Sequence, residues 1–310
     1  MPEVSVCICT FRRAAQLRLL LQDLAAQTHR PQQVVVVDND PSGSGRPGTE
    51  GDWPFALHYD IQPERNISLT RNRTIAHATG EWIGILDDDE RVPADWLATM
   101  LSTAAEGGAE VVVGPVLYRL PEDAPGWISP ALFPTPRHTH GRPFPINRIG
   151  GGNALLKASR VRAQCREGWG PYDPALGITG GEDVEFFLRL HHAGAVMVWC
   201  DRVAAWEPVA AERLNWRWIR RRALRGGQDY ARNTRLGHFA PRRPWTAPAF
   251  LAEALVKLLI AAAVCLLWLP LSRRRAAPWA VKLWANAGKL GGWFGAHYRE
   301  YAPRPGERSA

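Results

Sequence analysis

The sequence predicts an α/β protein with a mostly parallel sheet flanked by helices, followed by a C-terminal helical segment that associates with a membrane. Short apolar runs alternate with stretches of helical periodicity, and acidic clusters stand where two of those runs end. Residues 258–271 are all apolar or proline, which predicts the membrane segment. In this chain of 310 residues we expect one large globular domain over 1–211, a basic linker or helix over 212–245 and a membrane-associated helical tail over 246–310.

The elements follow one another as strand, helix and strand from the start of the chain. In chain order we expect a strand over 4–10, a helix over 14–27 with leucines on one side, a strand over 34–37, a helix over 68–78, a strand over 81–86 and another strand from 111. Strand, helix and strand in this order form a βαβ unit, whose strands are parallel.

Both acidic clusters follow predicted strands. Asp38 and Asp40 come after the second strand, and Asp87, Asp88 and Asp89, with Glu90 behind them, come after the apolar run 82–86. Open α/β sheets bind ligands at this carboxyl edge. Crowded carboxylates repel one another, which raises their pKa values unless a divalent cation offsets the charge, and oxygen ligands suit Mg²⁺ or Mn²⁺. A solvated acidic turn is the alternative.

The middle of the chain supplies further candidate site segments. Residues 121–150 are rich in Pro, His, Arg and Gly and predict a long surface loop, a kind of loop that is commonly functional. Gly150–Gly152 opens a segment, residues 153–161, that we expect to run through the site. Glu182 and Asp183 then lie in the first turn of a predicted helix, where the helix dipole favours negative charge.

Charge is distributed unevenly along the chain. Residues 1–211 carry 19 Lys and Arg against 25 Asp and Glu, residues 212–245 carry 10 against 2, and residues 246–310 carry 9 against 3. This gradient indicates an anionic surface met by the C-terminal third. We expect no nucleic-acid partner, because the arginines accompany a long apolar stretch and no recognisable nucleic-acid module.

The apolar tail allows more than one arrangement. Residues 258–271 fall short of the roughly 20 that a spanning helix needs, and only an extension back to Ala247 is long enough. Arginines at both ends, at 242–243 and 273–275, disfavour a single span. A re-entrant or interfacial hairpin returning over 278–293 fits the charges better. A buried core helix of a soluble protein is the alternative.

Cysteine usage and the start of the chain predict the compartment. The five cysteines are odd in number and lack a CxxC spacing, so we expect them to be reduced. No signal peptide precedes the first strand. We therefore expect the first domain to lie in the cytoplasm, at the cytoplasmic face of the inner membrane.

Five motifs together resemble a known family. In chain order they are Val4-Ser-Val-Cys-Ile-Cys-Thr-Phe-Arg-Arg13, Val34-Val-Val-Val-Asp-Asn-Asp40, Thr70-Arg-Asn72, Gly80-Glu-Trp-Ile-Gly-Ile-Leu-Asp-Asp-Asp89 and Thr179-Gly-Gly-Glu-Asp183. The order is that of family 2 glycosyltransferases with the GT-A fold, and over residues 3–230 the chain is similar to bacterial succinoglycan-type exopolysaccharide glucosyltransferases.

The resemblance implies a UDP-sugar site and assigns its residues. Asp89, helped by Asp87, would hold Mg²⁺ or Mn²⁺, which stabilises the departing nucleoside diphosphate. Asp183 would be the catalytic base, taking the proton of the acceptor hydroxyl in a single displacement with inversion. The residues implied to bind the nucleotide sugar are Thr10, Phe11, Arg12, Asp38, Asp40, Arg71, Asp87, Asp88, Gly152, Asn153, Gly181 and Glu182.

Some of these assignments have plainer alternatives. Which of Asp38 and Asp40 meets the base is open, because the family often has Asp-Asp where this chain has Asp38-Asn39. Arg71 could be an ordinary surface arginine of a helix. Glu182 and Asp183 could be a charge pair at a helix N-terminus.

One departure from the family predicts how the enzyme works. Processive members carry Gln-x-x-Arg-Trp, whereas Leu214 stands at the Gln position before Arg217 and Trp218. The resemblance therefore implies a non-processive transferase that adds one hexose to a lipid-linked saccharide acceptor. Transfer directly to a polyprenyl phosphate is the rival within enzymes, and a non-catalytic binding protein for nucleotide sugars or anionic lipid is the rival from another class. Asp183 favours an enzyme, since binding alone does not need it.

Overall fold

The computed structural model describes residues 2–300, which form two compact units. Residues 118–134 and 208–298 make up the second unit, and the first contains the remaining described residues. The boundary near residue 208 lies close to the predicted one at 211. The predicted basic segment 212–245 does not stand alone, because it packs in one unit with the helices that follow it.

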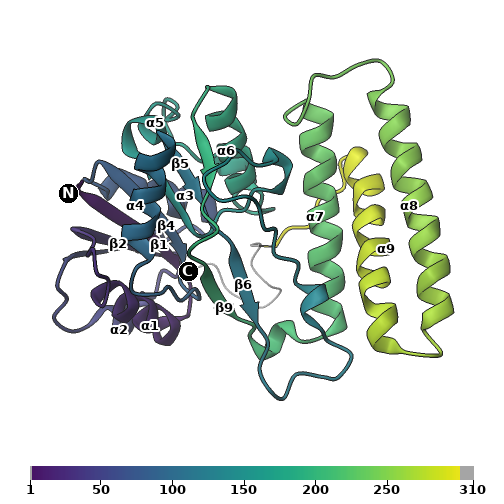
Figure 1. Cartoon of the computed structure of the whole chain (residues 1–310), viewed down its shortest axis with the longest axis horizontal. Coiled ribbons are helices and arrows are strands. Elements are labelled where there is room, and N and C mark those ends of the chain that lie inside the picture. Colours follow the sequence, from purple (N-terminus) through teal and green to yellow (C-terminus); the bar gives the residue numbers. More distant parts are fainter. Residues whose placement is uncertain (1, 301–310) are drawn as a thin grey trace. The chain divides into compact units, whose positions relative to one another are not determined.

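The first unit is built on a seven-stranded sheet (Figure 1). Its order is β3 (Ala56–Ile61), β2 (Gln33–Asp38), β1 (Val4–Thr10), β4 (Trp82–Asp87), β7 (Ala154–Lys157), β5 (Val111–Val113) and β8 (Met197–Trp199). Only β7 is antiparallel to its neighbours, so the predicted mostly parallel sheet is confirmed. The register pairs Thr10 with Asp38 and Cys9 with Asp87, so β1, β2 and β4 end at one edge.

Helices cover both faces of this sheet because successive strand residues point to opposite sides. On one face, Val6, Ile8, Val34 and Val36 pack against α1 (Ala14–Ala25) and α4 (Trp96–Gly107). On the other, Cys7, Val35, Val37, Ile83 and Ile85 pack with α3 (Ile67–His77), α5 (Ala158–Arg162) and α6 (Glu182–His192). The helices that cover the sheet turn apolar side chains at helical spacing toward it, such as Leu17, Leu20, Leu21 and Leu24 of α1.

Several elements were not expected from the sequence. The edge strand β3 directs His58 and Asp60 toward α3, so it lacks an apolar alternation on that face. The four-residue β7 is too short to show periodicity. The predicted loop 121–150 contains the 3₁₀ helices Pro130–Leu132 and Ile146–Arg148 and is divided between the two units.

Smaller elements complete the chain. They are the helix α2 (Arg46–Thr49), the pair β6 (Val116–Arg119) and β9 (Ala205–Pro208), and the 3₁₀ helices Pro174–Leu176 and Ala211–Arg213.

The second unit places three long helices side by side, with α9 (Arg273–Trp293) between α7 (Trp216–Leu236) and α8 (Thr246–Trp268) (Figure 1). Glycines allow α7 and α9 to touch backbone to backbone. A Cβ on Gly227 would lie 1.9 Å from the Ala285 carbonyl oxygen, and one on Gly288 would lie 2.1 Å from that of Leu224. Helix α9 returns along α8, as the predicted hairpin requires, while a re-entrant or interfacial position in a membrane stays a prediction.

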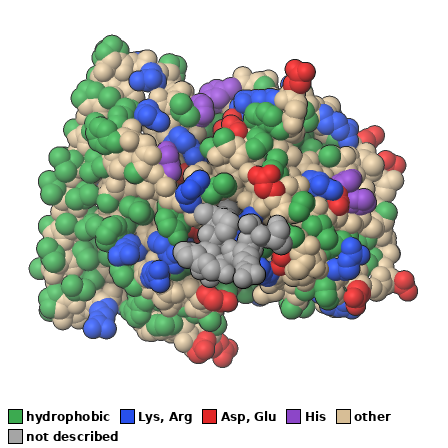
Figure 2. Space-filling view, turned by 180° about the vertical axis from the view of Figure 1, so that it is seen from behind, with side chains coloured by type: hydrophobic (Ala, Val, Ile, Leu, Met, Phe, Trp, Pro, Cys, Tyr) green, Lys and Arg blue, Asp and Glu red, His purple; other side chains and the backbone are tan. Residues whose placement is uncertain are grey.

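Helix α8 is apolar and largely uncovered. It has the length and composition to cross a membrane, and only 11% of its most apolar 18-residue window is buried. The alternative of a buried core helix is therefore wrong for this structure. Hydrophobic side chains gather over this unit in Figure 2. The large apolar residues exposed on α8 are Leu255, Val256, Leu259, Ile260, Leu266 and Leu267.

Candidate active site

The acidic run at the end of β4 lies at the carboxyl edge of the first unit's sheet, as predicted. Its three aspartates differ in exposure: the side chain of Asp87 is 43% exposed, that of Asp89 is 13% exposed and that of Asp88 is 5% exposed. The run is therefore not a solvated acidic turn. Asp87 and Asp89 remain accessible, while Asp88 is enclosed.

Arg13 lies against this run, a contact that the sequence analysis did not anticipate. Its guanidinium donates to Asp88 at 2.8 Å and lies 2.9 Å from Asp89, and the Thr10 hydroxyl donates to Asp88 at 2.8 Å. Burial raises the pKa of Asp88 to about 6, although the Arg13 charge works in the opposite direction. The position of Arg13 next to the predicted Arg12 is the one sequence signal that could have indicated it.

Glu90 and the Gly150–Gly152 segment link two acidic motifs. Glu90 is buried, and one of its oxygens accepts from the Asp87 N–H at 3.2 Å, while burial raises its pKa well above the ordinary range. A Cβ on Gly152 would lie 2.2 Å from the Glu90 Oε1, and one on Gly151 would lie 2.5 Å from the Asp183 Oδ2. The glycine segment therefore fills the space between the end of β4 and the start of α6.

Arg71, on α3, joins the same two motifs through its charge. Its Nε lies 3.1 Å from Glu182 and an Nη 3.2 Å from Asp87, and the residue is 8% exposed. The plainer interpretation as a surface arginine is therefore wrong. Burial would lower the pKa of Arg71, but Asp87 and Glu182 hold it well above its usual value. Burial and the nearby Asp183 raise the pKa of Glu182 to about 7, against the effect of Arg71.

Asp183 and Glu182 occupy different surroundings although they are neighbours. Glu182 is buried against Arg71, whereas Asp183 is half-buried, and its Oδ1 accepts from the Val184 N–H at 2.8 Å. Gly181 precedes them with a φ of 84°, the left-handed conformation that lets the chain turn sharply into α6. Of the pair, Asp183 is the carboxylate that a second reactant can reach.

Asp38 and Asp40, which the sequence could not separate, have different roles in the fold. Asp38 is fully buried and accepts from the Asp40 N–H at 2.9 Å, the Gly45 N–H at 2.6 Å and the Tyr59 hydroxyl at 2.8 Å. Burial would raise the pKa of Asp40, but hydrogen bonds from Arg12 and the Ser42 N–H outweigh it and leave the pKa below the usual value. Asp38 thus holds the turn that follows β2 in place through the N–H groups of Asp40 and Gly45, and Asp40 pairs with Arg12.

Phe11 lies between two guanidinium groups at the end of β1. The Arg12 and Arg65 groups lie 4.8 and 4.7 Å from the centre of its ring. Arg12 has a φ of 56° and an exposed side chain. This left-handed backbone turns the chain at the sheet edge and directs the arginine outward.

Asn153 is enclosed, and its side chain is fully engaged with the fold. Its side chain accepts from the Trp96 indole N–H at 2.8 Å and donates to the Pro115 carbonyl at 2.8 Å, and the residue is 0% exposed. Its φ of 48° sets the path from the glycine segment into β7. The Asn153 side chain therefore shapes the site, and its predicted contact with the donor finds no support from these bonds.

The carboxylate oxygens at the end of β4 are suitable ligands for a divalent cation that prefers oxygen. Asp87 and Asp89 offer carboxylate oxygens, and a site with few protein ligands completed by substrate phosphates is typical of Mg²⁺ and Mn²⁺. Arg13 and Arg71 already neutralise part of the charge. A cation there would share Asp89 with Arg13 and Asp87 with Arg71.

The comparisons with known proteins agree with the motifs. The model of the family described as Glycosyl transferase family 2 matches residues 5–162. The chain is 32% identical over 302 residues to the succinoglycan biosynthesis protein ExoM of Rhizobium meliloti, an alignment that covers 94% of this chain and 93% of that one.

Solved structures show the same fold. The mannosyltransferase PcManGT from Pyrobaculum calidifontis, in complex with GDP-Man and Mn²⁺, superposes with a TM-score of 0.61 at 19% identity, over 95% of this chain and 88% of that one. TarS 1–349 of S. aureus in complex with UDP-GlcNAc gives a TM-score of 0.52 at 14% identity, over 94% and 89%. The similarity to both extends over nearly the whole chain.

Proposed function

Because this chain belongs to glycosyl transferase family 2 and is a glycosyltransferase of the GT-A fold, we propose that it transfers a hexose from a UDP-sugar to a lipid-linked saccharide. The reaction inverts the anomeric centre, depends on a divalent cation and adds one sugar per encounter. The similarity to a succinoglycan biosynthesis protein supports a role in the synthesis of a bacterial cell-surface polysaccharide.

The observation that carries the proposal is that the neighbouring carboxylates Glu182 and Asp183 differ in exposure, since only Glu182 is buried in an ion pair. Arg71 holds Glu182 at 3.1 Å and is itself held by Asp87, so the acidic pair is fixed in place. Asp183 stays partly accessible and packs against Gly151, where any side chain would collide with its carboxylate. A fixed, accessible carboxylate can take the proton from an acceptor hydroxyl as that oxygen attacks the sugar.

The donor would lie along the ends of β1, β2 and β4. Phe11 would stack on the base in place of the Arg12 or Arg65 guanidinium that lies over its ring. We assign the uracil N–H or the ribose to Asp40, because its side-chain partner is the exposed Arg12, whereas Asp38 is held by three donors within the fold. Arg13 and Arg71 bring two cations to the position of the diphosphate. Gly152, packed against Glu90, and Gly181, at the start of α6, would line the position of the sugar without side chains of their own.

Asp89 and Asp87 would hold Mg²⁺ or Mn²⁺, whose charge would stabilise the departing diphosphate. The positive charges of Arg13 and Arg71 would help to stabilise the departing diphosphate, and they also hold the aspartates in position. Arg13 touches Asp88 and Asp89, and Arg71 touches Asp87, so the negative groups are kept in position before any donor arrives.

We propose that the acceptor is lipid-linked and met at the cytoplasmic face of the membrane, and the exposed apolar surface of the second unit supports the contact with lipid. Helix α8 exposes apolar side chains along its length, while α9, which carries Lys282 and Lys289, packs between α8 and α7. A helix pair with one apolar outer face suits a position in the plane of the interface. Arginines at 242–243 and 273–275 flank α8 and would meet anionic headgroups.

An assay with membranes tests the whole proposal. Membranes from cells that express the chain are incubated with a panel of radiolabelled UDP- and GDP-sugars, and lipid products are extracted and separated. We expect one UDP-hexose to label a lipid-linked saccharide, and membranes carrying Asp183→Asn not to do so. Label on a polyprenyl phosphate without a saccharide would favour the rival acceptor, and no transfer with any donor would contradict an enzyme of this kind.

A further inference from the structure

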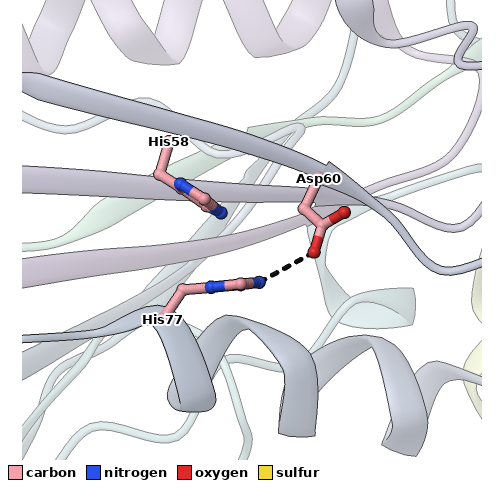
Figure 3. Close-up of side chains that lie close together, drawn as sticks. All are labelled: His58, Asp60 and His77. Carbon is pink, nitrogen blue, oxygen red and sulfur yellow. Dashed lines mark hydrogen bonds and ion pairs between the residues drawn. The ribbon is translucent and has the colours of Figure 1, made fainter.

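A second cluster of ligand-type side chains lies between the edge strand β3 and the helix α3. His58 and Asp60 lie two residues apart on the edge strand β3 and point to the same face of the sheet, and His77 ends α3 above them. Figure 3 shows both imidazole rings directed toward the Asp60 carboxylate. None of the three residues belongs to the site described above.

The three side chains offer ligand atoms close to one another. One nitrogen from each histidine and one Asp60 oxygen all lie within 4.8 Å, and no other group of His, Cys, Asp or Glu within residues 2–300 does this with three members. Ligand atoms around a tetrahedral zinc lie about 3.3 Å apart. Small rotations of the side chains would close the difference, and all three are partly exposed, so an ion can reach them.

His58 provides an observation that a simple ion pair does not explain. His77 Nε2 lies 2.7 Å from the Asp60 Oδ2, which satisfies that ring nitrogen. The Nε2 of His58 is enclosed and has no hydrogen-bond partner among the described residues. An enclosed polar atom left unpaired is costly, and a metal ion would remove that cost.

Asp60 is prepared to act as a ligand. Arg73 donates to both of its oxygens, at 2.5 and 3.1 Å, and the Ile61 N–H donates at 2.8 Å. The hydrogen bonds from Arg73 hold the pKa of Asp60 below its usual range, so the carboxylate is charged. Hydrogen bonds that orient a ligating carboxylate are typical of the surroundings of metal sites, although the Arg73 charge also weakens the attraction of a cation.

We propose that His58, Asp60 and His77 bind Zn²⁺, or a similar transition-metal ion, as three protein ligands with a further position open to water. Two imidazoles favour zinc, copper or nickel, whereas the all-carboxylate edge at Asp87 and Asp89 favours Mg²⁺ or Mn²⁺. The chain thus has two candidate metal sites of different chemistry. An ion at the second one would fasten the edge strand β3 to the last turn of α3, the helix that carries Arg71.

Zinc binding without nucleotide tests this site independently of sugar transfer. Full-length protein without a histidine tag is stripped with chelator, and its Zn²⁺ affinity and stoichiometry are measured by calorimetry. We expect one Zn²⁺ per chain, and at least tenfold weaker binding in His58→Gln and in His77→Gln. Co²⁺ offered in place of Zn²⁺ should give visible absorption bands that His58→Gln loses.

Two controls make the result decisive. His191→Gln removes an exposed histidine of α6 and should bind Zn²⁺ like the parent, and Asp89→Ala should do so as well, which separates this site from the carboxyl edge. His77→Gln also loses a bond to Asp60 and could unfold, so His58→Gln, which loses no bond from its Nε2, is the deciding variant. Equal zinc affinity in His58→Gln and His191→Gln would overturn the proposal.

Discussion

The two units of the chain depart from the usual pattern of globular proteins in opposite ways, since one buries charged side chains and the other exposes apolar ones. The first unit encloses charge: Asp88, Glu90, Glu182 and Arg71 are each less than 10% exposed at the sheet edge. The second unit does the reverse, because α8 leaves leucine, isoleucine and valine side chains uncovered. Buried charge and exposed apolar surface are both unfavourable without a partner.

The difference teaches that the two units are suited to different partners. Carboxylates fixed by arginines suit a phosphorylated donor with its cation, while an uncovered apolar helix flanked by arginines suits a lipid phase with anionic headgroups. A transferase that works on a lipid-linked acceptor needs both. Each prediction below either separates the two units or tests one of them.

The largest effect is expected from Asp183→Asn in the first unit. The amide keeps the shape of the side chain and loses the proton acceptor, so kcat should fall by about 10²–10⁴-fold with nearly unchanged affinity for the donor. Single-turnover kinetics and calorimetry with UDP measure the two quantities. The exposed Asp52→Asn serves as the matched control and should behave as the parent. A variant that retained more than about a tenth of the parent rate would exclude Asp183 as the base.

Next in size is the loss of membrane binding when α8 is made polar. Leu255, Leu259 and Leu266 are 48%, 57% and 69% exposed, and their joint change to Gln should weaken binding to anionic vesicles by about 10²–10³-fold. Leu19→Gln, at a position 43% exposed on α1, is the control and should have no effect. High salt should leave the parent bound, because burial of apolar side chains is not screened. Cosedimentation that is the same for both variants would count against the lipid partner.

These substitutions are preferable to removal of residues 246–310. Deletion would also remove α9, whose Ala277 belongs to the core of the second unit and whose Gly288 contacts the backbone of α7. A truncated chain could leave the membrane because its second unit had unfolded. The leucine variants alter only the outer face of α8.

A smaller effect is expected at the cation site. Asp89→Ala should reduce the Mn²⁺-dependent part of UDP affinity by at least about tenfold, because few protein oxygens remain to bind the cation. Calorimetry with and without Mn²⁺ measures this part. Equal affinities of variant and parent in the presence of Mn²⁺ would remove Asp89 from the assignment, and membrane binding should not change in either case.

The smallest expected effect is on the pH dependence of stability. The pKa of Glu182 is raised to about 7 in the folded chain, above its ordinary value near 4.5, so the folded state binds this proton more tightly. Its contribution to stability is therefore present below pH 4.5 and lost as the pH rises to 7. In Glu182→Gln the free energy of unfolding should fall less over this interval, by on the order of 1 kcal/mol. Urea unfolding at several pH values measures it, with the exposed Glu167→Gln as control.

The sequence predicted the parallel core and the site edge because these depend on local pattern. Apolar runs marked β1, β2 and β4, and the acids after them marked the edge. The strand β3 was missed because it is a half-exposed edge strand in which polar His58 and Asp60 take the positions that face α3. The antiparallel β7 was missed because its place between β4 and β5 depends on pairing over long separations.

The sequence indicated which residues gather at the candidate site but not how they are connected. The motifs indicated Asp87, Asp89 and Asp183 but not that Arg71 joins Asp87 to Glu182, because a contact across 111 residues leaves no local pattern. Arg13 was passed over for its neighbour Arg12. The burial of Asn153 follows from its bonds to Trp96 and Pro115, which only the folded chain brings together.

The position of α9 between α7 and α8 has a consequence for the order of events during synthesis. Helix α8 ends at Trp268, and its main packing partner is complete only at Trp293. At roughly 5–20 residues per second, residues 269–293 take about 1–5 s to add. During that interval the most apolar helix of the chain has no α9 to pack on, so a lipid surface or a chaperone meets it first. The nascent chain is therefore expected to expose its most apolar helix before its second unit can fold.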